Sequence, residues 1–161
     1  MKSRVVVGEK ALVWAMLIMV LPMLGACQKD EINNNELKCP VTAIEGANDN
    51  VVGKWKLVKV RIVQLDDGIS MKDYSCKNII YDFKQDGSLV VNGAQKDVHS
   101  FENGEYSFVF SDTPIWEGMG DEFKFTLKIG STGAACGINN NNMIVDYAPL
   151  DGNTYYFVRF E

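Results

Sequence analysis

The side chains with the most reactive chemistry in this 161-residue chain are four cysteines and one histidine. The cysteines are Cys27, Cys39, Cys76 and Cys136, and no two of them have the Cys-x-x-Cys spacing of zinc or thioredoxin-like sites. His99 stands alone in a polar segment, which is typical of a surface histidine, because metal sites combine several ligands. The sequence therefore predicts no bound metal and no cofactor.

The other polar clusters form no recognisable catalytic set. Ser131 has no histidine–aspartate pair that could activate its hydroxyl, and no two carboxylates are singled out as an acid–base pair. The glycine-rich segments 118–120 and 130–133 lack the phosphate-loop and dinucleotide patterns. Residues 66–68 lack the spaced acidic ligands of a calcium loop and favour a turn. We therefore expect a protein that is not an enzyme.

The first 26 residues have the composition of a secretory signal. Basic residues at positions 2, 4 and 10 precede an apolar run from Ala11 to Ala26. This run is shorter than the roughly 20 residues of a membrane span, contains Pro22 and ends in small residues. Residues 1–26 are therefore predicted to be a cleaved signal peptide.

The residues at the predicted cleavage site read Leu24-Gly25-Ala26-Cys27. This resembles the lipobox of bacterial lipoproteins, which implies cleavage before Cys27 and acylation of its thiol and amino group. Several acyl chains would anchor the chain firmly in membrane lipid. Residues 28–31 (Gln-Lys-Asp-Glu) resemble a surface-export signal of some Gram-negative bacteria. The resemblance implies a lipoprotein of the outer membrane that faces outward.

The chain after the signal is acidic, and its first part is polar. Of 16 basic and 21 acidic residues, three and one respectively lie in the first 26, so the remainder has a net charge of −7. That charge argues against nucleic acid as a partner, because phosphate binding needs clustered lysine and arginine. Residues 27–52 contain few bulky apolar side chains, so we expect a lipidated cysteine followed by a flexible tether.

Three cysteines remain after Cys27 is lipidated, and an oxidising compartment favours one disulfide among them. Three pairings are possible, and the spacing does not choose between them. The pairing of Cys76 with Cys136 is slightly favoured, because both residues lie inside the expected domain.

The rest of the chain predicts strand after strand with turn residues between. Seven segments alternate or are rich in β-formers: 53–63, 78–83, 88–92, 105–110, 122–129, 142–147 and 154–160. An eighth lies at 96–101 or at 134–138, and we favour the second. The short connections predict an antiparallel meander that closes into an eight-stranded up-and-down barrel. A sandwich is the alternative, but it needs longer crossovers.

Gly53-Lys54-Trp55 opens the first predicted strand, and Arg159 lies in the last. This pairing resembles the lipocalin and wider calycin pattern, in which the arginine crosses over the indole at the closed end of the barrel. Residues 55–60, 78–84, 87–93 and 151–158 look like the lipocalin-like domains of small bacterial surface lipoproteins. The resemblance implies a lipocalin-like domain over residues 53–161 and supplies no ligand.

Eight aromatic side chains are predicted to point into the barrel. They either fill the interior or line a cavity for one small ligand. The eight are Tyr81, Phe83, Tyr106, Phe108, Phe110, Phe123, Phe125 and Tyr147.

Trp116 lies on the connection 111–118 and is expected to form a contact surface or a lid over the barrel. The expected function is non-enzymatic binding of a small apolar or amphipathic ligand by a lipid-anchored barrel. The alternative is a solid-cored module that binds envelope proteins through its loops.

Overall fold

The computed structural model describes residues 36–64, 68–96, 99–118 and 120–161. The predicted signal peptide, Cys27 and the first part of the predicted tether lie outside these ranges. Within them, no helix has the length and apolar character needed to cross a membrane.

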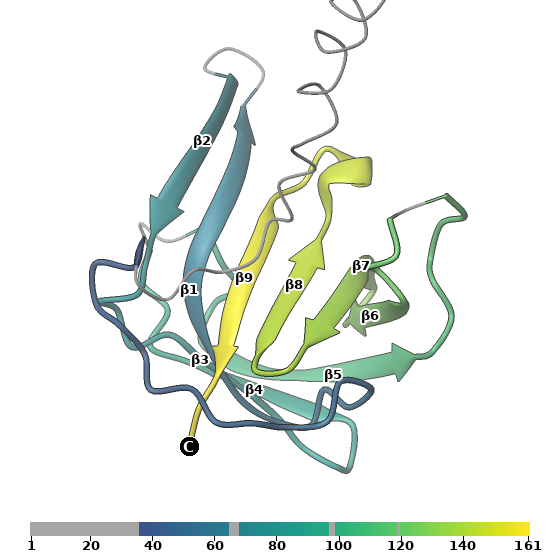
Figure 1. The fold of residues 1–161 in the computed structure, drawn as a ribbon, viewed down its shortest axis with the longest axis horizontal. Helices are drawn as coiled ribbons and strands as arrows, with labels where there is room; N and C mark the ends of the chain where they lie inside the picture. Colours follow the sequence, from purple (N-terminus) through teal and green to yellow (C-terminus); the bar gives the residue numbers. More distant parts are fainter. Residues whose placement is uncertain (1–35, 65–67, 97–98, 119) are drawn as a thin grey trace, which may run out of the picture. The chain divides into compact units, whose positions relative to one another are not determined.

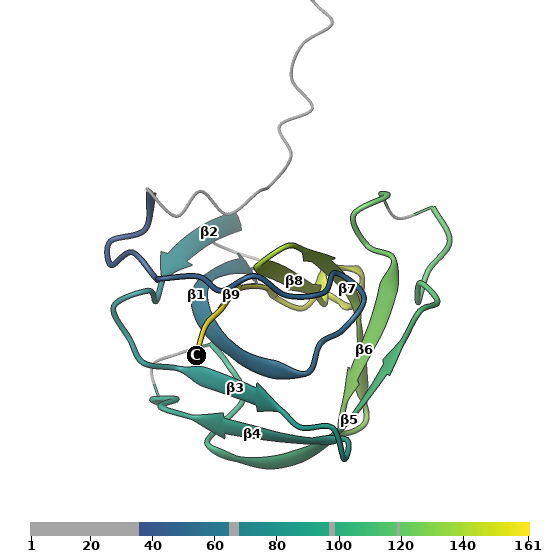
Figure 2. The same cartoon turned by 60° about the horizontal axis from the view of Figure 1, so that its bottom comes forward.

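The described residues form nine antiparallel strands in one sheet that closes on itself (Figures 1 and 2). In chain order these are β1 (Gly53–Gln64), β2 (Gly68–Asp73), β3 (Ile80–Phe83), β4 (Ser88–Asn92), β5 (Gly104–Ser111), β6 (Phe125–Ile129), β7 (Thr132–Asn139), β8 (Asn142–Asp146) and β9 (Thr154–Arg159). A 3-10 turn, η3 (Ala148–Leu150), precedes β9.

Eight of the nine strands make the barrel. Each strand from β3 to β9 pairs with the next, and β1 pairs with both β3 and β9, which closes the ring. The predicted eight-stranded antiparallel barrel is therefore confirmed. The favoured eighth strand at 134–138 is the centre of β7, and the described residues of 96–101 form no strand.

The ninth strand, β2, was not predicted. It pairs with the second half of β1, from Lys59 to Gln64. Along the same edge of β1, β3 pairs with the first four residues of that strand. The register places Ser70 and Lys72 opposite the inward-facing Ile62 and Val60. The inward positions of β2 are thus polar, so its sequence lacks the pattern of a strand that covers a core.

Alternation along the strands builds the core. In β6, Phe125, Leu127 and Ile129 are buried, while Thr126 and Lys128 between them are not. A side chain points to opposite faces at successive positions of a strand, so one face of β6 is apolar and the other polar. The same pattern in the other barrel strands gives one cluster of buried apolar residues inside the ring.

The segment that precedes β1 belongs to the folded body, which corrects the prediction of a flexible tether up to residue 52. Leu37 and Val41 are buried against Val58, Tyr156 and Val158 on the outer face of the barrel. The backbone then crosses the lower end of the barrel in Figures 1 and 2, where Ile44 N donates to the carbonyl oxygen of Arg159 at the end of β9. These few apolar residues are too sparse to predict a fold alone, but the barrel wall supplies the partner surface they need.

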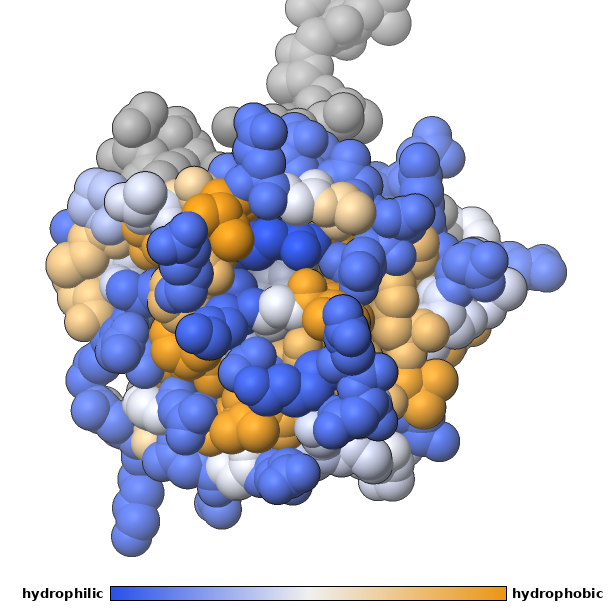
Figure 3. Space-filling view, turned by 90° about the horizontal axis from the view of Figure 1, so that it is seen from below, coloured by the Kyte–Doolittle hydropathy of each residue, from blue (hydrophilic) through white to orange (hydrophobic). Residues whose placement is uncertain are grey.

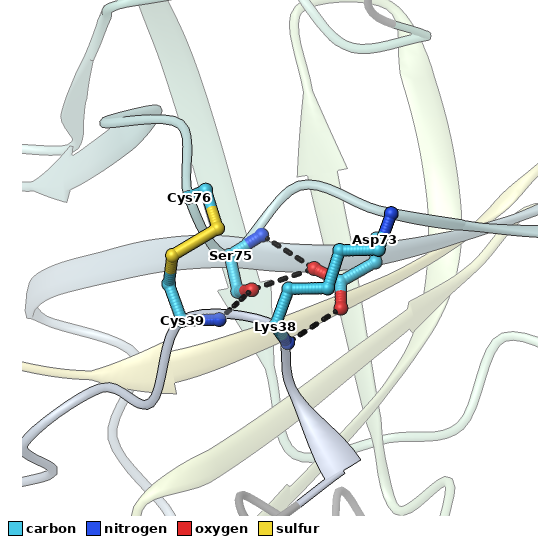
Figure 4. Close-up of a disulfide and its surroundings, with 5 residues drawn as sticks. All are labelled: Lys38, Cys39, Asp73, Ser75 and Cys76. Atoms are coloured by element: carbon cyan, nitrogen blue, oxygen red, sulfur yellow. Dashed lines mark hydrogen bonds between the residues drawn. A yellow bond between two sulfur atoms is a disulfide. The ribbon is translucent and has the colours of Figure 1, made fainter.

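The disulfide joins Cys39 to Cys76, with Cα atoms 5.0 Å apart, and the predicted Cys76–Cys136 bridge is wrong (Figure 4). Cys136 is buried and free on the inward face of β7. Cys76 is exposed on the turn after β2, so the two side chains are on opposite sides of the barrel wall. The pairing prediction failed because it excluded Cys39 as part of a tether.

Asp73 and Ser75 hold the backbone beside this disulfide (Figure 4). Lys38 N donates to Asp73 Oδ2 over 2.9 Å, and Cys39 N donates to Ser75 Oγ over 3.0 Å. Ser75 donates to Asp73 Oδ1 through both its backbone nitrogen and its hydroxyl. Burial raises the pKa of Asp73, but the hydrogen bonds from Ser75 and Lys38 outweigh it and leave the pKa below its usual value.

Candidate ligand site at the open end of the barrel

The two ends of the barrel are built differently. The end where β1 begins and β9 finishes is covered by the segment 44–52 and is called the closed end below (Figure 2). The opposite end carries the β1–β2, β4–β5, β6–β7 and β8–β9 connections, and it is called the open end.

Trp55 and Arg159 seal the closed end, as the sequence predicted. Trp55 is fully buried, and its Nε1 donates to the carbonyl oxygen of Val51 over 2.7 Å. The guanidinium carbon of Arg159 lies 4.3 Å from the centroid of the Trp55 ring. Burial lowers the pKa of Arg159 from its usual value, because a charged group is less stable away from water.

Arg159 also binds the backbone that covers this end. Its Nη2 donates to the carbonyl oxygens of Ala47 and Asn50 at 3.0 and 2.8 Å, and its Nη1 donates to that of Val52 at 3.3 Å. A Cβ atom on Gly46 would lie 2.5 Å from the guanidinium carbon, so the close approach at that position requires glycine. Both Nη atoms of Arg159 are engaged and only its buried Nε has no hydrogen-bond partner, so the closed end is a structural seal.

The barrel interior is packed. The cavity at its centre has a volume of about 10 Å³, roughly the space that one water molecule needs. Tyr81, Phe83 and Tyr147 line it, as predicted. Phe101, Tyr155, Phe157 and three aliphatic residues complete the wall. Of the two alternatives for the aromatic residues, the structure favours filling.

The other predicted interior residues divide into two groups. Phe125 is buried in the core, and Tyr106, Phe108 and Phe110 pack against it with partial exposure. Phe123 lies outside the interior, because β6 begins only at Phe125 and the preceding residues follow a different course. A Cβ atom on the outward-facing Gly137 would lie 3.9 Å from the Phe123 ring. Phe123 therefore cannot be a residue of an interior ligand site.

A larger hollow of about 320 Å³ opens above the packed interior, at the open end. The β8–β9 connection supplies Leu150, Asp151, Gly152 and Asn153, and β7 supplies Thr132. Phe101, Tyr147 and Tyr155 line both this hollow and the small interior cavity. These three rings therefore separate the two spaces and form the floor of the hollow, which is called the mouth below.

The floor carries one hydroxyl group without a partner. Tyr147 is 7% exposed, and its Oη has no hydrogen-bond partner among the described residues. Burial raises the pKa of Tyr147, so the group is a neutral phenol that can donate one hydrogen bond. By contrast, Tyr81 Oη, deeper in the barrel, accepts a bond from Phe101 N at 3.1 Å. Tyr147 thus contributes its ring to the floor of the mouth, whereas its hydroxyl is buried away from solvent.

Cys136 lies within the core below this floor. It is fully buried, and burial raises the pKa of its thiol. Because the thiolate is the reactive form of cysteine, Cys136 is an inert core residue rather than a nucleophile. His99 is exposed, and the described residues contain no group of three or more side chains that could hold a metal ion.

Trp116 is half-buried rather than exposed. Its loop folds over the outer face of β6 and β7, where Thr126 Oγ1 donates to the carbonyl oxygen of Thr113 over 2.7 Å. A Cβ atom on the outward-facing Gly133 would lie 2.9 Å from Ile115 Cδ1. The loop covers the barrel wall and contributes no residue to the mouth, which argues against the lid.

Comparison of the chain with protein-family models, with curated proteins and with solved structures finds no match. The mouth is therefore characterised by its own geometry. Sequence reasoning missed Phe101, Leu150 and Tyr155, because two of them lie on connections and Tyr155 was counted only within a strand. The signal that could have identified the mouth is Phe101, an aromatic residue on a long connection between two strands.

Proposed function

We propose that this chain is a lipid-anchored binding protein of the outer membrane, without catalytic activity, that holds a small apolar or amphipathic molecule in its mouth. The carrying observation is the hollow of about 320 Å³ above a floor formed by the rings of Phe101, Tyr147 and Tyr155. Binding pockets of comparable size, about 300 Å³ and above, hold small molecules.

Fluorescence titration of the mature protein with N-phenyl-1-naphthylamine tests the binding site. Thr132→Trp should fill the mouth and weaken binding by at least about tenfold, because the new ring occupies the space above the floor. Ser107→Trp places the same ring on the exposed outer face of β5 and should leave binding unchanged. Absence of probe binding to the wild type, with only bare protein in native mass spectra of material from cells, would contradict the proposal.

The anchor is tested separately. Cys27→Ser should abolish metabolic labelling with palmitate, because the thiol that carries the lipid is lost. Unchanged labelling would remove the support that the Leu24-Gly25-Ala26-Cys27 motif gives to a lipoprotein.

A second candidate is a solid-cored module that binds envelope proteins through its loops. The packed interior favours it, since the central cavity of about 10 Å³ leaves no room for a ligand below the floor. Trp116→Ala should then change the set of envelope proteins recovered by pull-down. If wild type and variant recover identical sets and the probe binds in the mouth, the solid-cored module is excluded and the ligand-binding protein remains.

A further inference from the structure

Exposed apolar side chains gather at the open end of the barrel. Among the described residues, five large apolar side chains are exposed, and four of them belong to this end: Val63, Ile69, Met71 and Leu150. Leu150 lies on the rim of the mouth. The other three lie on the two-stranded ribbon that Lys59–Gln64 of β1 forms with β2, which is called the β1–β2 ribbon below. The fifth, Val109, lies on the outer face of β5.

The three residues of the ribbon share one face. Val63 and Ile69 are direct cross-strand partners, and Met71 is the partner of Arg61, two positions before Val63. Side chains that are paired across strands or two positions apart lie on the same face of a sheet. Ile69 is 62% exposed and Met71 is 53% exposed, so this face carries an apolar surface with nothing packed on it among the described residues.

The closed end has a different surface. Seen from below, hydrophilic residues dominate it, with smaller apolar areas between them (Figure 3). None of the five exposed large apolar side chains belongs to the segment 44–52 or to the turns at that end. The barrel therefore has one end suited to water and one end with apolar groups around a mouth.

The folded body begins beside the β1–β2 ribbon. Lys59 Nζ lies 3.8 Å from Glu36 Oε2, and the Cys39–Cys76 disulfide fixes the next residues. Eight residues lie between Cys27 and Glu36, and the nine residue-to-residue steps span at most about 30 Å. From Lys59 to Val63 the ribbon continues for about 13 Å, so an anchor at Cys27 can lie level with the tip of the ribbon.

The geometry points to a lipid surface as the partner of the open end, with the mouth facing the membrane. This inference rests on the proposed function, since the tether must carry lipid at Cys27. The same tether also reaches the closed end, about 20 Å from Lys59 in the other direction, so the apolar residues decide the orientation. Apolar side chains at a membrane interface lie about 5–10 Å deep, at the boundary between headgroups and acyl chains.

The rim carries both signs of charge, with Arg61 and Lys72 on the ribbon and Asp151 beside Leu150. Apolar burial rather than charge is therefore the attraction, and a neutral lipid suffices for the interaction. The orientation also specifies the ligand class of the mouth. A molecule that enters from the membrane side would be a membrane amphiphile, with its apolar chain over the aromatic floor.

Tryptophan substitutions test the orientation on the lipidated mature protein in phosphatidylcholine vesicles with brominated acyl chains. Ile69→Trp should be quenched about twofold more strongly than Val109→Trp, because only the former reaches the boundary of the acyl chains. The two positions are a matched pair, since both side chains are 62% exposed. The wild type, with Trp55 and Trp116, supplies the background emission.

Co-flotation with the vesicles measures the anchor independently of the orientation. Protein that floats but shows equal quenching at the two positions would overturn docking and leave the anchor intact. Failure of the protein to float would overturn the anchor. Docking would still be supported if Ile69→Trp, in an unlipidated Cys27→Ser background at high lipid concentration, is quenched more strongly than Val109→Trp. If the protein is a dimer without lipid and the tryptophan of Ile69→Trp is then inaccessible to a quencher in solution, the ribbon binds a second copy of the chain. That result would overturn docking.

Discussion

The guanidinium of Arg159 covers the ring of Trp55, with 4.3 Å between the guanidinium carbon and the ring centroid. One residue thus joins the last strand, the first strand and the segment before it, because the same guanidinium donates to three carbonyl oxygens of residues 47–52. The seal depends on this residue more than on any single apolar contact at the closed end, since those carbonyls accept no other hydrogen bond that the structure shows.

Arg159→Met should lower the free energy of unfolding by about 2–4 kcal/mol. Methionine keeps an apolar stem over Trp55 but leaves the three carbonyl groups without their donor. Arg61→Met, on the half-exposed outer face of β1, should change stability by no more than about 0.5 kcal/mol. Urea unfolding monitored by tryptophan fluorescence compares the two, and equal effects would contradict the role given to Arg159.

The double variant Cys39→Ser/Cys76→Ser should lose about 2–4 kcal/mol of stability, because the disulfide restricts the unfolded chain. The two cysteines are 37 residues apart. Iodoacetamide should label the native wild type nowhere and the denatured, unreduced protein once, at Cys136. Three labelled sites before reduction, at Cys39, Cys76 and Cys136, would show that the disulfide is absent.

Asp73 should contribute to the stability of the protein in acid. Its pKa is lowered in the folded state, so its contribution is fully present above the unfolded value of 3.8 and is lost as the pH falls through the folded value. Asp73→Asn should therefore show a smaller loss of unfolding free energy between about pH 5 and pH 2. Asp112→Asn, on an exposed loop, controls for the removal of one charge; acid profiles that coincide for wild type and Asp73→Asn would count against this assignment.

Two tyrosines inside the barrel should respond oppositely to the loss of their hydroxyl groups. Tyr147→Phe should leave stability unchanged or raise it by about 1 kcal/mol, because the hydroxyl has no partner. Tyr81→Phe should lower it by about 1–2 kcal/mol, because Phe101 N then loses its acceptor. Thermal unfolding without ligand measures both, and a clear loss in Tyr147→Phe would show that its hydroxyl is already satisfied.

Seven of the nine strands follow from alternation and turn residues, because side-chain period and glycine turns are local properties of the sequence. β7 was the favoured choice between two segments, and β2 was missed because it covers no core. Its apolar residues, Ile69 and Met71, face outward. A strand without a buried face has no local pattern that separates it from a loop.

The candidate site was only partly predictable. Tyr147 was singled out as an interior aromatic residue, whereas Phe101 and Leu150 lie on connections whose course no local rule determines. The pairing of Cys76 depended on whether residues 36–52 pack on the barrel, and this is a property of the outer surface of β1 and β9.

The sequence by itself determined the strand pattern and the closure expected of a meander, because both follow from local alternation and short connections. The contact between Trp55 and Arg159 was expected from the resemblance to the lipocalin pattern. Only the tertiary structure decided that Cys39 pairs with Cys76, that the interior is filled and that the mouth lies above a floor of Phe101, Tyr147 and Tyr155. The physical reason is that volume and proximity depend on how side chains from distant segments pack together, and no single segment contains that information.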